Sequence, residues 1–434
     1  MRKNFLCFFL GSSLLGNSFS ALASDQFAAT TKRTKDNLAV SWSDIQEYVT
    51  KRGYVETRGR GGVLRLAGDV RARWIYAKED IKDSKDKGTF ADTKKLLPIN
   101  RYRSEFNMYM SYLAENNWMT SKMRWAAVAG GENTAAGVDI DRAFIGYRLF
   151  RNPVTKSDFF IEIGRSGLGD MFESEVQFSS QFDGIHLYCS KRIAKALPWQ
   201  VIVHGGPFVV NMATKHYAWV AEGILSNLPA NFLMKYSIID WNSFKPETLS
   251  EDQQVKKPVK GAALPQKYEY LVGQFLLGNR SSMPWGKGKR KSIYLYGAVL
   301  TNYLAKATTT TLNKKENLAW FVGGTLGSLR KAGDWSVTVR YEVVEALAVP
   351  EIDVSGIGRG NSLKYWFAQA VAGNYDPKDA NGFTNYKGVS GLFAVGITNS
   401  LSFRAYGAYS RPENDKLGSD FTYRKFDVGL ISAF

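Results

Sequence analysis

The sequence predicts an all-β fold of about sixteen antiparallel strands closed into a transmembrane barrel, with a short N-terminal helix before it. Many segments alternate apolar and polar residues with a period of two, which is typical of strands with one apolar face. Aromatic residues make up 14% of the chain, as expected for aromatic girdles at membrane interfaces. The alternation continues through residues 421–434, so we expect the sheet to close with that strand.

Composition alone fits a secreted β-sandwich about as well as a barrel. The slightly negative mean hydropathy and the lack of a run of roughly twenty apolar residues exclude a helical membrane protein. They do not exclude a barrel, whose strands place only every second residue in lipid. The alternation of apolar and polar residues along the strands therefore has to distinguish a barrel from a β-sandwich.

Residues 1–23 have the pattern of a secretory signal peptide. Arg2 and Lys3 form a basic start, residues 5–15 are apolar, and residues 21–23 offer a small-x-small cleavage site. The removal of these residues lowers the net charge from +17 to +15, because two basic residues are lost. Of the two cysteines only Cys189 remains, so an intrachain disulfide is excluded and the sheet must provide compactness.

Residues 24–63 are expected to precede the barrel as a separate segment. Within it, residues 41–53 predict a short helix, with Ser43 and Gln46 as a capping box and Gly53 as its end. The glycine-rich residues 59–62 are expected to link this helix to the first strand, so the barrel should occupy residues 64–434.

Sixteen segments predict strands separated by short, regularly spaced turns. They are residues 64–78, 102–114, 118–129, 140–150, 159–164, 182–190, 199–211, 217–225, 232–241, 268–277, 293–303, 318–329, 335–345, 389–397, 401–410 and 421–434. Residues 115–117 are too short for anything but a hairpin, which indicates antiparallel neighbours.

Residues 362–372 are apolar enough for a seventeenth strand. Bacterial single-chain barrels have even strand numbers, with short turns at one end and long loops at the other. A strand here would break that alternation, so we expect a helix inside one long outer loop, residues 346–386. The other long outer loops are then expected at residues 79–100, 165–181, 242–267 and 304–317.

The last strand resembles the C-terminal strand of Gram-negative outer-membrane barrels, which the insertion machinery recognises. Asp427, Gly429 and Phe434 match that pattern, whereas Ser432 stands where the family usually has an aromatic or aliphatic residue. The resemblance implies an outer-membrane protein exported through the Sec route, with residues 24–63 in the periplasm and membrane lipid around the barrel. An edge strand of a soluble β protein is the alternative.

Seven basic residues lie opposite the apolar face on four consecutive strands, and we call them the basic wall. They are Arg71, Arg73, Arg103, Lys122, Arg124, Arg142 and Arg148. If the apolar face contacts lipid, the basic wall must line a lumen, and with few carboxylates nearby it would give that lumen a positive potential. A solvated outer face of a soluble protein is the alternative.

The arrangement of strands and loops resembles the trimeric general porins, whose third outer loop folds inward and narrows the pore. The resemblance implies that Asp170, Glu173 and Glu175 of this loop face the basic wall, with Gly167 and Gly169 permitting the inward bend. It also implies a possible homotrimer. An ordinary surface loop is the alternative.

Catalysis, a cofactor and metal binding are not expected. His186, His204 and His216 would have to converge from different strands, with a carboxylate, to bind a metal. A Ser-His hydrolase would need a serine, a histidine and an orienting polar partner. The chain does not resemble the outer-membrane lipases, whose pattern places Ser and Asn just after the histidine, because Gly205 and Gly206 follow His204. The signal peptide argues against nucleic acid as a partner, although the net charge is strongly positive.

The expected function is passive diffusion of small hydrophilic solutes, preferentially anionic ones, through a water-filled channel. Sixteen strands leave an aqueous channel rather than a core filled with side chains. A surface adhesin or receptor barrel that binds partners through the outer loops 242–267 and 346–386 is the alternative. A secreted soluble lectin is a third.

Overall fold

The computed structural model describes most of the chain from residue 55 onward. The described ranges are 55–59, 61–81, 99–128, 137–152, 157–193, 199–211, 216–241, 269–286, 290–307, 311–350, 353–357, 384–417 and 421–434. The expected signal peptide, the helix at 41–53 and the helix at 362–372 lie outside these ranges. No helix in the described ranges is both long and apolar enough to span a membrane.

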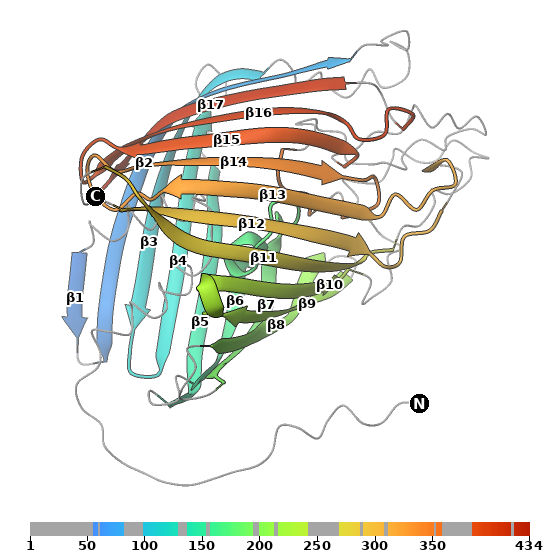
Figure 1. The fold of residues 1–434 in the computed structure, drawn as a ribbon. Helices are drawn as coiled ribbons and strands as arrows, with labels where there is room; N and C mark the ends of the chain where they lie inside the picture. The colour runs from blue at the N-terminus through green and yellow to red at the C-terminus, as the bar shows by residue number, and fades with distance from the viewer. Residues whose placement is uncertain are drawn as a thin grey trace, which may run out of the picture.

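The described residues form one antiparallel sheet of 17 strands (Figure 1). The strands are β1 (Val55–Gly59), β2 (Gly62–Ile81), β3 (Ile99–Leu113), β4 (Asn117–Val128), β5 (Gly137–Asn152), β6 (Ser157–Gly167), β7 (Gln181–Arg192), β8 (Gln200–Asn211), β9 (His216–Ser226), β10 (Phe232–Asp240), β11 (Leu271–Pro284), β12 (Arg290–Asn302), β13 (Leu318–Gly327), β14 (Trp335–Val344), β15 (Tyr386–Gly396), β16 (Leu401–Pro412) and β17 (Phe421–Ala433). Two short helical turns, α3 (Leu168–Met171) and η1 (Pro229–Asn231), complete the described elements.

Strands β2 to β17 close into a ring. Each pairs with its neighbour in sequence, and β17 pairs with β2 from Phe421↔Ile81 to Ala433↔Asp69. Gly68 and Phe434 continue this seam with two backbone hydrogen bonds of 3.1 and 3.0 Å. The prediction of a closed antiparallel barrel of sixteen strands is confirmed.

The first strand, β1, lies outside the ring of sixteen. It pairs with the start of β2, from Val55↔Leu66 to Gly59↔Gly62, on the edge that β17 uses further along. The glycine-rich stretch expected as a link therefore joins β1 to β2 as a tight hairpin, and the barrel begins at Gly62.

Side chains alternate between the two faces of the barrel wall. On β2 the side chain of Val70 is 47% exposed while that of Arg71 is 5% exposed, and on β17 the same contrast separates Phe426 at 43% from Asp427 at 1%. On these strands the outer face is apolar and the inner face is polar, which is the pattern of a barrel with lipid outside and water inside.

The loop between β6 and β7, residues 168–180, lies inside the ring and is called the inner loop from here on. In Figure 1 the green segment after β6 lies behind β11 and β12. Its side chains Leu168, Phe172 and Val176 are buried against the inner faces of β7 to β13, where they belong to one apolar cluster. Apolar burial therefore fixes the inner loop against one side of the barrel.

A second loop, after β14, supports the inner loop from the same side. Ser355 donates from its backbone to the carbonyl of Val176 at 3.1 Å and from its hydroxyl to that of Gln177 at 2.9 Å. These bonds give buried carbonyl groups of the inner loop the partners that they need.

Candidate channel lining and inner loop

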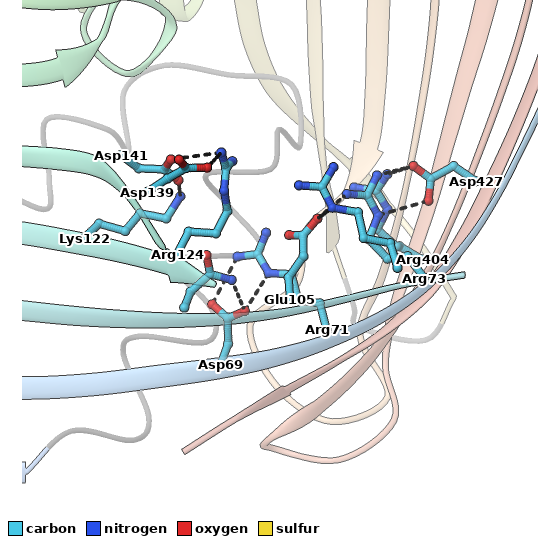
Figure 2. A network of polar contacts seen from close by, with 12 residues as sticks. Asp69, Arg71, Arg73, Glu105, Lys122, Arg124, Asp139, Asp141, Arg404 and Asp427 are labelled. Atoms are coloured by element: carbon cyan, nitrogen blue, oxygen red, sulfur yellow. Dashed lines mark hydrogen bonds and ion pairs between the residues drawn. The ribbon is translucent and has the colours of Figure 1, made fainter. Parts of the chain in front are cut away.

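The basic wall points into the barrel. Arg71, on β2, lies among polar side chains of β2 and β3 (Figure 2). Its Nε donates to Oδ1 of Asp69 at 2.5 Å, and its Nη2 donates to Oδ2 of Asp69 at 3.0 Å. Asn107 and Tyr109 also donate to the Asp69 carboxylate, at 2.9 and 2.8 Å. Asp69 thus neutralises Arg71 and accepts hydrogen bonds from both of its β3 neighbours.

A second network crosses the β17–β2 seam. Arg73 donates from Nη1 to Glu105 Oε1 at 3.0 Å. Its Nε and Nη2 donate to the carboxylate of Asp427. Arg103 also pairs with Glu105, at 2.9 Å, and Arg404 donates to Asp427 Oδ2 at 3.1 Å. Figure 2 shows these groups meeting from β2, β3, β16 and β17. Two carboxylates therefore hold three guanidinium groups.

Arg404 was not predicted from the sequence as a member of this surface. It stands between Phe403 and Ala405 on β16, so its alternation already placed it on the polar face. Its distance in sequence from the basic wall concealed the contact, because only closure of the ring brings β16 near β2.

Two further basic residues pair with aspartates of β5. Lys122 Nζ lies 2.7 Å from Asp141 Oδ2, and Arg124 Nη2 lies 3.0 Å from Asp139 Oδ2 and 3.3 Å from Asp141 Oδ1 (Figure 2). These aspartates share sequence parity with apolar residues further along β5, so strict alternation would place them outside.

A β-bulge explains their position. Lys122 pairs with Arg142 while Met123 pairs with Ile140, which leaves Asp141 as the extra residue. A bulge reverses the in-out parity on its two sides, so Asp139 and Arg142 both face inward although their numbers differ in parity. The expectation of few carboxylates beside the basic wall is therefore wrong.

The last two members of the basic wall are also paired. Arg142 Nη2 lies 2.7 Å from Asp170 Oδ2 of the inner loop, and Arg148 Nε donates to Asp158 Oδ1 at 3.1 Å. Burial raises the pKa of Asp170, but the charge of Arg142 and its hydrogen bond outweigh burial and lower it below its ordinary value. Asp170 is therefore ionised and ties the inner loop to β5.

The other two carboxylates of the inner loop do not contact the basic wall. Glu173 pairs with Lys235 of β10 at 2.6 Å and accepts from the Tyr294 hydroxyl at 3.1 Å. Lys235 is 1% exposed and Glu173 is 6% exposed, so this is a buried ion pair. It anchors the inner loop on the side of the barrel opposite β2.

Glu175 has its own partners on the same side. It pairs with Arg340 of β14 and accepts from the Tyr296 hydroxyl at 2.9 Å. Arg340 Nε also lies 2.7 Å from Glu342 Oε1. The inner loop thus contacts β5 through Arg142 and also contacts β10, β12 and β14. Each of its three carboxylates pairs with a basic residue on a different strand.

Asp353, after β14, holds the end of the inner loop. Its carboxylate accepts from the backbone N–H groups of Phe178 and Ser180, both at 3.0 Å, and its carbonyl accepts from Ser179 at 3.3 Å. Burial raises the pKa of Asp353 to about 7, although its hydrogen bonds with Phe178 and Ser180 act to lower it. This latch was not expected from the sequence.

The three residues of the expected insertion pattern lie along β17. Asp427 belongs to the network with Arg73 and Arg404 described above. A Cβ atom at Gly429 would lie 2.9 Å from Cγ of Arg73, so glycine leaves room for that side chain. Phe434 is 59% exposed on the outer face.

The described residues contain no group of three or more His, Cys, Asp or Glu side chains arranged to hold a metal ion. His186 and His204 do meet inside the barrel, with Nε2 and Nδ1 3.2 Å apart, and each contacts a glutamate. This is a linear chain across neighbouring strands. The contact between these two histidines was not predicted from the sequence.

Sixteen strands closed in a ring, apolar outside and charged inside, define an outer-membrane type of β-barrel wide enough for an aqueous channel. No family model and no curated protein sequence matches the chain.

Solved structures of outer-membrane porins match the barrel over most of its length. The low-pH structure of Pseudomonas putida OprB is 10% identical, with a TM-score of 0.44, covering 92% of this chain and 98% of that one. Salmonella typhi OmpF in complex with daunomycin is 10% identical, with a TM-score of 0.44, covering 88% and 100%. Outer-membrane expressed OmpT of Vibrio cholerae is 10% identical, with a TM-score of 0.43, covering 88% and 100%.

Proposed function

We propose that the chain forms a water-filled channel in the outer membrane for passive diffusion of small hydrophilic solutes. The charged inner surface, from Asp69 on β2 to Asp158 on β6, carries this proposal. An inner face built of ion pairs requires water or polar solutes beside it, whereas the outer face suits lipid. The inner loop fills part of the lumen and is its constriction.

Residues 1–23 support a route to that membrane as a Sec signal peptide, and residues 24–63 belong to the periplasmic side. Asp427, Gly429 and Phe434 support insertion by the outer-membrane machinery, since they follow the terminal-strand pattern. A homotrimer is part of the proposal by resemblance alone. Chemical cross-linking of the detergent-extracted protein tests it, with a ladder ending at three copies as the expected result.

A weak preference for anions is the finer part of the proposal. The ion pairs of the basic wall and Arg404 involve eight basic residues and seven carboxylates, so this side of the inner surface carries a small positive excess. The basic members are Arg71, Arg73, Arg103, Lys122, Arg124, Arg142, Arg148 and Arg404, and the acidic members are Asp69, Glu105, Asp139, Asp141, Asp158, Asp170 and Asp427. On the other side Lys235 and Arg340 face three carboxylates, Glu173, Glu175 and Glu342, so the preference comes from the basic wall alone. Screening at ionic strengths of about 1 M should remove the preference.

Planar-bilayer recording of the refolded protein tests the function. Stable conductance steps and swelling of proteoliposomes in small sugars are expected, and their absence would contradict the channel. A reversal potential that indicates cation selectivity at low salt would contradict the anion preference alone.

The constriction has its own test. Neutralising Asp170, Glu173 and Glu175 together releases the inner loop from Arg142, Lys235 and Arg340, so single-channel conductance and anion preference should both rise. Unchanged single-channel behaviour would show that the inner loop does not narrow the pore.

A further inference from the structure

Four titratable side chains form a continuous hydrogen-bonded chain across four neighbouring strands. Glu162 Oε2 lies 2.9 Å from His186 Nδ1, and His186 Nε2 lies 3.2 Å from His204 Nδ1. His204 Nε2 then lies 3.0 Å from Glu222 Oε1. We call these four residues the Glu-His-His-Glu chain; they come from β6, β7, β8 and β9 in order.

The local backbone allows the two imidazoles to approach. The β7–β8 ladder pairs Gly184 with Phe208 and next Leu187 with Gly205, so it is interrupted at His186. Gly205 has a φ of +147°, and a Cβ atom there would lie 2.1 Å from the carbonyl oxygen of Val220. Glycine at this position therefore supports the irregular geometry that brings His186 to His204.

Three members of the Glu-His-His-Glu chain are buried, and the fourth, Glu162, has a side chain that is 13% exposed. His186 and His204 are each 6% exposed and Glu222 is 1% exposed. Trp118 Nε1 donates to the second oxygen of Glu162 at 3.1 Å. The Phe172 ring of the inner loop stacks on His204, with ring centroids 4.9 Å apart and planes inclined by 5°. The inner loop thus rests directly on one member of the chain.

The geometry fixes the number of protons in the chain. Each of its three contacts joins two atoms that both carry lone pairs, so each contact needs one proton between them. Two neutral imidazoles beside two ionised glutamates supply only two protons. Three satisfied contacts therefore need one proton more, whether it is placed on an imidazole or on a glutamate.

The chain tolerates neither a lower nor a higher proton count. With two protons, one contact has lone pairs facing each other. With both imidazoles doubly protonated, the N–H of His186 Nε2 points at the N–H of His204 Nδ1. Either state leaves a buried polar group of the network unsatisfied, which is unfavourable. His204 then has to move, and the ring of Phe172 lies against it.

We propose that the Glu-His-His-Glu chain holds three protons and positions the inner loop through Phe172, so that the pore has its resting constriction only within a limited pH range. This inference rests on the proposed channel function.

Other charged and titratable groups surround the chain and enter its pH dependence. Arg142 on β5 acts electrostatically on Glu162, the ring of Tyr188 on β7 lies 6.0 Å from that of His204, and Arg148 lies over the ring of Trp118, which donates to Glu162. Asp170 of the inner loop pairs with Arg142, and Glu173, next to Phe172, pairs with Lys235 of β10. Asp353 holds the same loop elsewhere and has a pKa raised to about 7. The test is therefore made in an Asp353→Asn background.

The decisive variant is Glu222→Gln. Its amide donates to His204 Nε2, His204 Nδ1–H donates to His186 Nε2, and His186 Nδ1–H donates to Glu162. All three contacts are then satisfied by two neutral imidazoles, so no titrating proton can be lost on raising the pH. The opposing pair of N–H groups at low pH remains.

Single-channel conductance is recorded from about pH 4 to pH 9. The parent with Asp353→Asn should show one plateau bounded by a change on both sides. Adding Glu222→Gln should abolish the alkaline change and keep the acidic one. Phe172→Leu should weaken both, because the stack on His204 is lost while the chain remains. A conductance independent of pH in the parent, or an alkaline change unaffected by Glu222→Gln, would overturn the proposal.

A spectroscopic measurement separates this inference from the channel function. The ¹⁵N shifts of the His186 and His204 ring nitrogens, in detergent-solubilised protein, should show a proton shared between Nε2 and Nδ1 on the plateau. Glu222→Gln should extend that signature to alkaline pH. If no conductance is seen at any pH, the channel fails while the shifts still test the chain; if the shifts show two independent imidazoles, the chain fails whatever the conductance.

Discussion

The ring of Phe434 lies over the bare backbone of Gly68. A Cβ atom at Gly68 would be 2.4 Å from Cζ of Phe434, and the two residues exchange backbone hydrogen bonds of 3.1 and 3.0 Å. The same ring stacks on Phe106 at a centroid distance of 6.0 Å. The seam of the barrel thus ends on an aromatic ring that requires a glycine beneath it.

Gly68→Ala should displace the Phe434 ring and destabilise the barrel by about 1–3 kcal/mol, the usual cost of overpacking. The change is measured as a shift of the urea midpoint of the refolded protein. Gly407→Ala is the matched control, since a Cβ atom there meets nothing within 4 Å. Equal midpoints for the two variants would contradict the steric role of Gly68.

Asp427→Asn should destabilise the barrel by about 3–5 kcal/mol, because it removes the buried carboxylate that Arg73 and Arg404 share, while Arg73 keeps its pair with Glu105. It should also raise anion preference at low salt. Asp139→Asn removes a carboxylate of the same wall, but the Asp139 side chain is 63% exposed, so that variant should cost at most about 1 kcal/mol. Urea unfolding and reversal potentials measure the two effects, and a smaller loss for Asp427→Asn than for Asp139→Asn would refute the ranking.

Lys235→Met should lower the free energy of unfolding by about 3–5 kcal/mol, because it leaves the Glu173 carboxylate buried without its cation. The inner loop should be held less firmly as a result. Adding Glu173→Gln should restore much of that stability, since an amide needs no counter-charge. A double-mutant cycle on urea midpoints measures the coupling. A coupling energy near zero would show that the pair does not anchor the loop.

The Asp353 latch should weaken as pH rises. Its pKa is raised to about 7 from 3.8, so the folded latch favours the protonated acid. The contribution of Asp353 to the free energy of unfolding is fully present below pH 3.8 and is lost as the pH rises through about 7. Above that pH the free energy of unfolding is lower by roughly 4 kcal/mol. Asp353→Asn should remove this dependence.

Hydrogen exchange of the Phe178 and Ser180 amides, corrected for intrinsic rates, measures the latch. Protection should fall between about pH 5 and pH 9 in the natural chain and stay level in Asp353→Asn. Equal protection at both pH values in the natural chain would refute the prediction.

The ring of strands was predictable because alternation is a local property. On β17, Phe426 and Asp427 differ in polarity and lie on opposite faces, and the same reading placed Arg71 inside. Alternation fails where a bulge changes parity, which is why Asp139 and Asp141 were not assigned to the basic wall.

The contacts of the inner loop could not be predicted from the sequence, for a different reason. Sequence parity tells which face a side chain occupies but not its height on the wall, which depends on strand register. Lys235 and Arg340 were both predictable as polar-face residues, but their contacts with Glu173 and Glu175 depend on how far the loop crosses the lumen. The meeting of His186 and His204 likewise depends on the interrupted β7–β8 ladder.

Strand β1 gives the junction of the ring a second fastening. β17 occupies the edge of β2 as far as Asp69, Phe434 covers Gly68, and β1 takes over the same edge from Leu66 onward. Lateral opening of the barrel between β2 and β17 would require β17 to separate from β2. The first residues of β2 would then still be paired with β1. Lateral release of a lipid or an incoming strand at this junction is therefore hindered at the end that carries the short turns.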